Sequence, residues 1–278
     1  MQSSTLAFYS FVALGLCLVA WLMLEPAWHE ARRRRLRSRP FPAAWRAILR
    51  RRVPLFARLP ARLQLRLKQD MLVFLAEKPF VGCAGLQVKD EMRVTVAALA
   101  CMPLLGARRG YYPKLHRILL YPDAFVADQM QSGAGGVQHT GGRVLLGESW
   151  ARGQVILSWA DVLQGAADPH DGSNVVIHEF AHQLDQIKGY ASGAPPLRGR
   201  LAYRRWSERM QSAFDTLRLR LEQGEEDLLG SYAATDPAEF FAVCSEVFFE
   251  RAAELNQRYP QLFTELCGFY RINPLSWN

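Results

Sequence analysis

The amino-acid sequence predicts an α+β domain with a short sheet and a helical C-terminal half, preceded by one transmembrane helix. Three observations lead to this prediction: an unbroken apolar run over residues 6–24, short β-branched or aromatic segments between residues 117 and 159, and apolar residues at helical spacing from residue 165 onward. A group of strands followed by a group of helices is typical of α+β folds.

The apolar run LAFYSFVALGLCLVAWLML (residues 6–24) is followed closely by the arginine-rich run ARRRRLRSR. As a helix it would span about 28 Å, near the thickness of the hydrocarbon core of a bilayer. Arginines beside a membrane span stay in the cytoplasm. We therefore expect a single-pass anchor in the inner (cytoplasmic) membrane, with the rest of the protein in the cytoplasm. A cleaved signal peptide is the alternative, but no basic residue precedes the run.

Positive charge is concentrated in one segment. Residues 32–68 contain thirteen arginines, one lysine and no acidic residue, whereas the whole chain carries +8. With the two acids of residues 1–31, this leaves a balance of −4 for residues 69–278. A mildly acidic globular part does not fit a nucleic-acid partner. An RNA-binding arm over residues 32–68 is the alternative interpretation, and it leaves the apolar run unexplained.

These features divide the chain into a membrane anchor (1–31), a basic juxtamembrane linker (32–59) and one globular domain (60–278). The five cysteines are scattered and form no C-x-x-C motif. This usage is typical of reduced thiols in a reducing compartment and excludes a disulfide framework.

Within the globular domain the apolar pattern predicts helices and strands in turn. The helices are expected at residues 62–78 and 92–105, the strands at 117–122, 142–149 and 154–159, and a flexible loop at 132–142. The segment QVILSW (residues 154–159) is a candidate edge strand for pairing with an extended peptide. A strand inside the core is the favoured interpretation of the same segment.

The stretch VVIHEFAHQLDQIKG (residues 175–189) predicts a helix that carries a metal site. His178 and His182 are four residues apart and therefore lie one above the other on a helix, where both can bind one ion. Glu179 lies beside them and can reach a metal-bound water. The pattern H-E-x-x-H is typical of zinc peptidases, and its alternative is a solvated helix face with two incidental histidines. Asp185, one turn after His182, is a candidate partner for a ligand, or a solvated or capping acid.

A catalytic zinc usually takes three protein ligands and a water. No H-x-x-G-x-x-H follows His182, so the third ligand is a later carboxylate or a distant histidine. The segment DPAEFFAVCSEVFFE (residues 236–250) offers Glu239 and Glu246, which are seven apart and share a helix face. Asp236 and Glu239 also fit a capping box, in which Glu239 would only stabilise the start of the helix.

The segments HEFAHQLD and YAATDPAEFFAVCSEVFF resemble the Mlc titration factor A family of zinc peptidases. YPDAFVAD, GESWARGQVILSWADV and VAALACMPLL are also similar to that family, and the match covers roughly residues 60–275. The resemblance implies a zincin-like domain of the gluzincin type, with His178, His182 and Glu239 as zinc ligands. It also implies that Glu179 is the base and that a transcriptional repressor of the Mlc type is a partner.

The catalytic domain of anthrax lethal factor has a similar arrangement, with a tyrosine seven residues before its ligand glutamate. Tyr232 stands seven residues before Glu239. By this resemblance Tyr232 would donate a hydrogen bond to the developing oxyanion.

We therefore expect a zinc-dependent metallopeptidase that hydrolyses peptide bonds by a metal-activated water and is tethered to the cytoplasmic membrane. Its substrate would be a peptide or protein, and both aminopeptidase and endopeptidase activity stay open. The alternative is a regulatory module that binds an Mlc-type repressor and has weak or vestigial peptidase activity.

Overall fold

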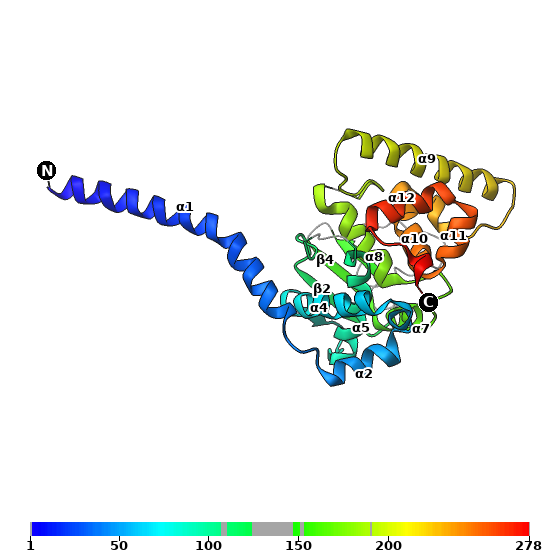
Figure 1. The fold of residues 1–278 in the computed structure, drawn as a ribbon, viewed down its shortest axis with the longest axis horizontal. Coiled ribbons are helices and arrows are strands. Elements are labelled where there is room, and N and C mark those ends of the chain that lie inside the picture. The colour runs from blue at the N-terminus through cyan, green and yellow to red at the C-terminus, as the bar shows by residue number, and fades with distance from the viewer. Residues whose placement is uncertain (1, 107–109, 124–146, 151–152, 190, 278) are drawn as a thin grey trace. The chain divides into compact units, whose positions relative to one another are not determined.

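The computed structural model describes residues 2–106, 110–123, 147–150, 153–189 and 191–277. The chain forms two compact units, residues 1–40 and 41–278 (Figure 1). The predicted loop at 132–142 and the first part of the predicted strand at 142–149 lie outside the described residues. The division of the chain at residues 31 and 59 stays a prediction.

The first unit contains one long helix, α1 (Gln2–Arg37). The apolar run is not a separate element, because the helix continues through Glu25 and Pro26 into the arginines. No helix in the described part of the chain combines the length and the apolar character that a membrane crossing needs. The prediction of a transmembrane helix is therefore wrong, and so is the single-pass localisation in the inner membrane.

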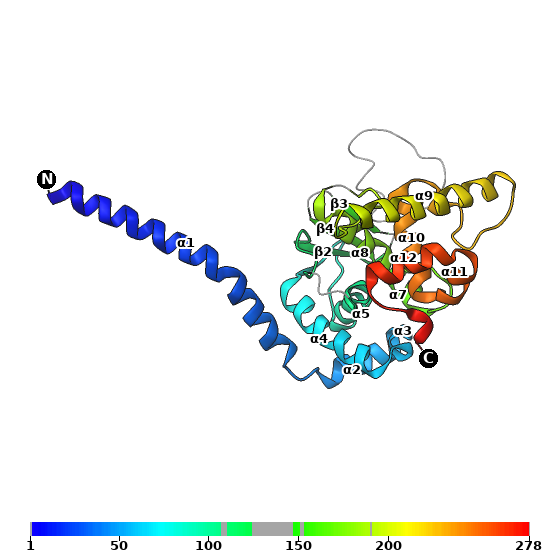
Figure 2. The same ribbon diagram turned by 45° about the horizontal axis from the view of Figure 1, so that its top comes forward.

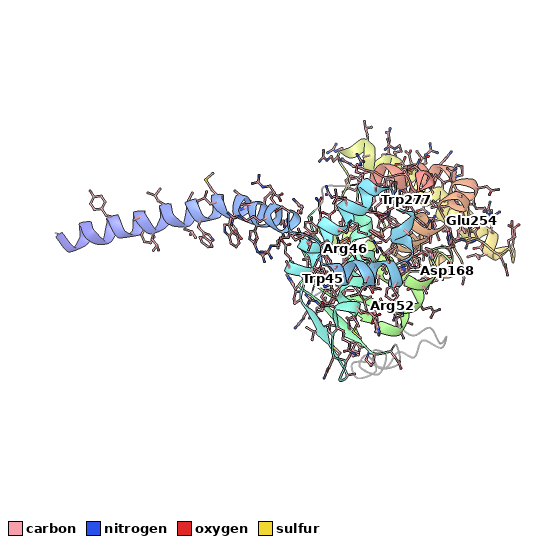
Figure 3. The ribbon with its side chains drawn as sticks, turned by 60° about the horizontal axis from the view of Figure 1, so that its bottom comes forward. Trp45, Arg46, Arg52, Asp168, Glu254 and Trp277 are labelled. Atoms are coloured by element: carbon pink, nitrogen blue, oxygen red, sulfur yellow. The ribbon has the colours of Figure 1, made fainter. Side chains whose placement is uncertain are left out.

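The second unit begins with three helices, each of which starts after a proline. They are α2 (Ala43–Arg52), α3 (Leu55–Arg58) and α4 (Ala61–Glu77), followed by α5 (Asp90–Cys101) and the 3-10 turn η1 (Met102–Leu104). The helices predicted at 62–78 and 92–105 are confirmed within a few residues. Trp45 and Arg52 of α2 (Figure 3) hold α2 against α5, because their side chains bind Asp90 and Glu91.

A small sheet of four strands follows the order β1-β2-β4-β3. The strands are β1 (Phe80–Gly82), β2 (Arg117–Tyr121), β3 (Gly147–Trp150) and β4 (Gln154–Ser158). The first pairs are parallel, with Ile118 opposite Val155, and β3 runs antiparallel to β4. The candidate edge strand at 154–159 is therefore an interior strand, as the favoured interpretation had it, and the outer strands among those described are β1 and β3.

The rest of the chain is helical (Figure 2). Its elements are α7 (Trp159–Ala167), α8 (Val175–Asp185), η2 (Gln186–Lys188), α9 (Arg200–Glu222), η3 (Tyr232–Ala234), α10 (Pro237–Glu250), α11 (Ala252–Arg258), α12 (Pro260–Tyr270) and η4 (Pro274–Ser276). The structure as described is thus mostly helical with a small sheet, which corrects the predicted α+β domain with a membrane-spanning helix in front.

Aromatic side chains form the core around α8 and α10. Phe180 of α8 packs edge-on against Tyr112 and Phe74, with ring centroids 4.7 and 5.6 Å apart. Phe241 of α10 packs in the same way against Trp206 of α9. Such pairs add about 0.5–1.5 kcal/mol each beyond the area they bury. They fix the two helices whose polar faces meet in the site described next.

Candidate metal centre

Helix α8 carries the H-E-x-x-H residues. Asn174 caps its first turn, since the side-chain oxygen accepts a hydrogen bond from the backbone N–H of Ile177. Because α8 is short and buried on most sides, its histidines are held among packed neighbours. The predicted helix is confirmed, and it places His178 and His182 on one face with ring centroids 4.8 Å apart.

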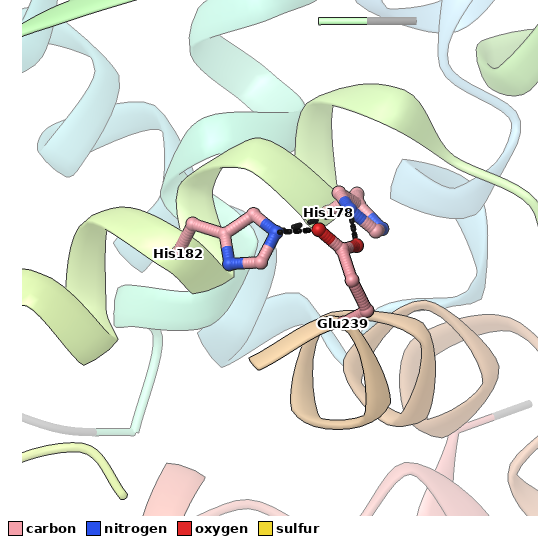
Figure 4. Close-up of side chains that lie close together, drawn as sticks. All are labelled: His178, His182 and Glu239. Atoms are coloured by element: carbon pink, nitrogen blue, oxygen red, sulfur yellow. Dashed lines mark hydrogen bonds and ion pairs between the residues drawn. The ribbon is translucent and has the colours of Figure 1, made fainter. Parts of the chain in front are cut away.

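Helix α10 carries the acidic residues. Asp236 caps it by accepting hydrogen bonds from the backbone N–H groups of Ala238 and Glu239. The side chain of Glu239 does not serve this cap; it reaches from the first turn of α10 to the histidines of α8 (Figure 4). Asp236 therefore caps the helix, while Glu239 contacts the histidines.

Possible metal-binding atoms of three residues converge between α8 and α10. Nε2 of His178 lies 3.2 Å from Nε2 of His182 and 2.9 Å from a carboxylate oxygen of Glu239. The other oxygen of Glu239 lies 3.5 Å from His182. Tetrahedral ligands at zinc bond lengths lie about 3.3 Å apart. The spacing and the donor types therefore fit a zinc ion, and these residues form a possible metal site.

The charges at this centre act on one another. Burial tends to raise the pKa of Glu239, but the hydrogen bonds and charges of His178 and His182 outweigh it and hold this pKa well below its usual range. Burial opposes the charged form of His178, yet Glu246 and Glu239 raise the pKa of its ring well above the ordinary value. The centre therefore presents an ionised carboxylate to its histidines, as a cation site requires.

Glu246 lies behind His178, on the side away from Glu239. One of its oxygens is 2.8 Å from Nδ1 of His178, and the other accepts the backbone N–H of Asn174. Glu246 thus contacts a histidine of the centre but stands two turns further along α10 than Glu239. Of these two acids, Glu239 belongs to the group of residues that could hold a metal, and Glu246 does not.

Glu179 and Tyr232 lie close to the same centre. Glu179 is 2% exposed, and its charge raises the pKa of both His178 and Tyr232. The ring of Tyr232 lies 6.0 Å from that of His178. Burial and a hydrogen bond with Glu239 raise the pKa of Tyr232 well above its usual range, so its hydroxyl keeps its proton. The structure therefore brings together all five of the predicted site residues.

Asp185 contacts the loop after α8; burial raises the pKa of its carboxyl, and the charge of His182 is among the interactions that oppose this rise. One carboxylate oxygen accepts the backbone N–H groups of Ser192 and Gly193, each at 2.6 Å. Asp185 is buried and braces the loop after α8, a role that neither interpretation of this residue included. This loop lies against Pro237 at the start of α10, two residues before Glu239.

Residues 28–271 match the family described as glucose-regulated metallo-peptidase M90. The chain belongs to this family. Membership indicates a metallopeptidase-type function and a peptide substrate, and it confirms the resemblance to Mlc titration factor A that the motifs suggested.

Several relatives match nearly their whole length. An uncharacterised protein of Synechocystis sp. is 39% identical over 259 residues, which cover 93% of this chain and 94% of the relative. Mlc titration factor A of Yersinia enterocolitica is 34% identical and covers 84% of this chain and 87% of its own length. The protein of the same name from Klebsiella pneumoniae is 36% identical, with coverage of 81% and 84%.

The sequence did not predict that Asn174, at the start of α8, forms hydrogen bonds with two acids of α10. Asn174 donates from its side chain to the carbonyl of Gly165 and to a carboxylate oxygen of Glu250, while its backbone N–H binds Glu246. The acids at 246 and 250 are one turn apart on α10, and that spacing is the one signal that could have indicated a shared partner.

Proposed function

We propose that this M90 peptidase is a zinc enzyme in which His178, His182 and Glu239 hold the ion. The observation that carries the proposal is the convergence of two imidazole nitrogens and one carboxylate between α8 and α10. When bound, zinc supplies a Lewis acid that polarises the scissile carbonyl and lowers the pKa of water.

Glu179 is the proposed general base. It follows His178 directly on α8, and it lies near enough to His178 and Tyr232 to raise the pKa of both. A carboxylate in this position would accept a proton from the attacking water and deliver it to the leaving amine. Its burial keeps bulk solvent from competing for that proton.

Tyr232 is the proposed donor to the oxyanion. Its side chain is partly exposed, at 42%, so it can face a substrate in the site as well as Glu239. Because the raised pKa keeps the hydroxyl protonated at neutral pH, it can donate a hydrogen bond as negative charge develops on the carbonyl oxygen.

The sheet edge next to α8 offers a place for the substrate backbone. Among the described strands β3 pairs only with β4, and β3 packs against α8. An extended peptide that paired with the outer edge of β3 would run alongside the proposed zinc ligands. This arrangement is compatible with aminopeptidase and with endopeptidase activity.

Replacement of Glu179 by glutamine tests the proposal. The variant should retain zinc, because Glu179 is not a ligand, and should lose peptide turnover by about 10²–10⁴-fold. Loss of zinc together with activity would show that Glu179 has been assigned the wrong role.

A second candidate function follows from the relatives called Mlc titration factor A. It is a regulatory module that binds an Mlc-type repressor and uses its metal site for structure. Such a module would bind the repressor equally well with Glu179 or glutamine and would show no peptide turnover in either form. Turnover that depends on Glu179 would decide for the enzyme.

A further inference from the structure

We propose that Glu246 is a positioning residue, which holds His178 with its proton on Nδ1 so that Nε2 is available to a metal. This inference rests on the proposed zinc function of His178. It extends that function by naming the group that orients the ligand and the reason why no amide can replace it.

Both carboxylate oxygens of Glu246 have a hydrogen-bond partner. The residue is 6% exposed, and each of its two oxygens faces a different donor. One oxygen lies 2.8 Å from Nδ1 of His178, and the other accepts the backbone N–H of Asn174. A carboxylate has no proton of its own and can only accept. His178 must therefore carry a hydrogen on Nδ1, and its Nε2 faces His182 and Glu239.

Asn174 is held firmly as the second donor. Its side-chain oxygen accepts from Ile177, and its side-chain nitrogen donates to Gly165 and Glu250. These bonds fix the residue at the start of α8. Its backbone N–H is therefore a permanent donor that always points at residue 246.

This permanent donor decides what a glutamine would do at position 246. An amide has one accepting oxygen and one donating NH₂ group. The oxygen must face the backbone N–H of Asn174, because two donors facing each other would leave both unsatisfied. The NH₂ group must then donate to Nδ1 of His178. Nδ1 then carries no hydrogen, so the hydrogen on Nε2 that bonds Glu239 is the only one on the ring, and a metal could replace it only by leaving an imidazolate.

Glu250 supplies a matched control. It lies one turn further on α10, is 2% exposed and accepts from the side chain of Asn174. A glutamine at 250 can keep that bond through its oxygen, and the bond is to Asn174 rather than to His178. The substitutions Glu246→Gln and Glu250→Gln therefore each replace one carboxyl oxygen by an NH₂ group next to the same asparagine, with different consequences for the histidine.

The test uses the full chain and zinc alone. Zinc affinity is measured by competition with a chromophoric chelator for the wild type, Glu246→Gln and Glu250→Gln. We expect Glu246→Gln to bind zinc about 10–100-fold more weakly and Glu250→Gln to stay within about 3-fold of the wild type. Nitrogen-15 NMR of the metal-free chain should show a proton on Nδ1 of His178 in the wild type and in Glu250→Gln, and none there in Glu246→Gln.

Two results would overturn the inference. Wild-type affinity in Glu246→Gln would show that the carboxylate does not orient the ligand. Equal losses in both variants would show that the acids only support the fold. A wild-type chain that binds no zinc would refute the proposed function instead, and the NMR comparison would still decide the role of Glu246.

Discussion

Gly193 and Pro237 touch so closely that no side chain fits between them. A Cβ atom added at Gly193 would lie 2.3 Å from the carbonyl oxygen of Pro237, and Gly193 has a φ of +73°. The backbone N–H of Gly193 also donates to Asp185 at the end of α8. The loop after the histidine helix is thereby pressed against the helix start that carries Glu239.

Gly193→Ala should therefore lower both the zinc affinity and the free energy of unfolding. The added methyl group would push the start of α10 away, and the positive φ adds a further penalty of about 1–2 kcal/mol. Gly224→Ala is the control, because Gly224 has a φ of +77° and no atom near its Cβ position. Urea unfolding and zinc titration of both variants measure the difference. Equal behaviour of the two would mean that the contact with Pro237 is unimportant.

Stability should fall as the pH rises through the neutral range, because of Glu250. Burial raises the pKa of this carboxyl from 4.5 to about 9, so the folded state binds a proton that the unfolded state releases. The resulting stabilisation is present below pH 4.5 and is lost as the pH rises toward 9, at up to about 1.4 kcal/mol per pH unit. Glu250→Gln should flatten this dependence in urea unfolding at pH 6 and pH 8. An unchanged slope would argue against a buried, protonated Glu250.

Tyr232→Phe should lower kcat and leave zinc content unchanged. The substitution removes the hydroxyl that is proposed to stabilise the oxyanion, and loss of one such donor lowers kcat by about 10²–10³-fold. The ring, which lies beside His178, is retained. Steady-state kinetics on a peptide substrate would show the effect, and an unaltered kcat would remove Tyr232 from the mechanism.

Zinc binding should tighten as the pH rises from acid to neutral. Glu239 and Glu246 raise the pKa of His178, so a metal must displace a proton from its ring. Calorimetric titrations in buffers of different ionisation enthalpy would show this proton release. Binding without release of protons would show that His178 is not a ligand.

The sequence predicted the parts of the site that depend on local spacing. The positions of His178 and His182 on one helix face follow from the helical repeat, and the cap at Asp236 follows from its position before Pro237. Contacts between segments that are distant in the sequence could not be predicted from local spacing. The alternatives for Glu239, the bracing role of Asp185 and the tie from Asn174 to Glu246 all depend on how α8 meets α10.

The N-terminal helix also shows what a local sequence pattern can and cannot predict. Residues 6–24 satisfied a local rule on length and apolarity. Helix α1 runs on to Arg37, and no helix in the described ranges meets the demands of a membrane crossing. The local pattern therefore predicted the helix correctly, whereas the prediction that this helix crosses a membrane was wrong.

Zinc stoichiometry tests the central claim most directly. The purified full chain is dialysed against zinc and then against metal-free buffer, and its metal content is compared with that of Glu239→Ala and of Glu208→Ala, a substitution on the exposed face of α9. The account predicts about one zinc ion per chain for the wild type and for Glu208→Ala, and almost none for Glu239→Ala. Zinc retained by Glu239→Ala at the wild-type level would contradict it.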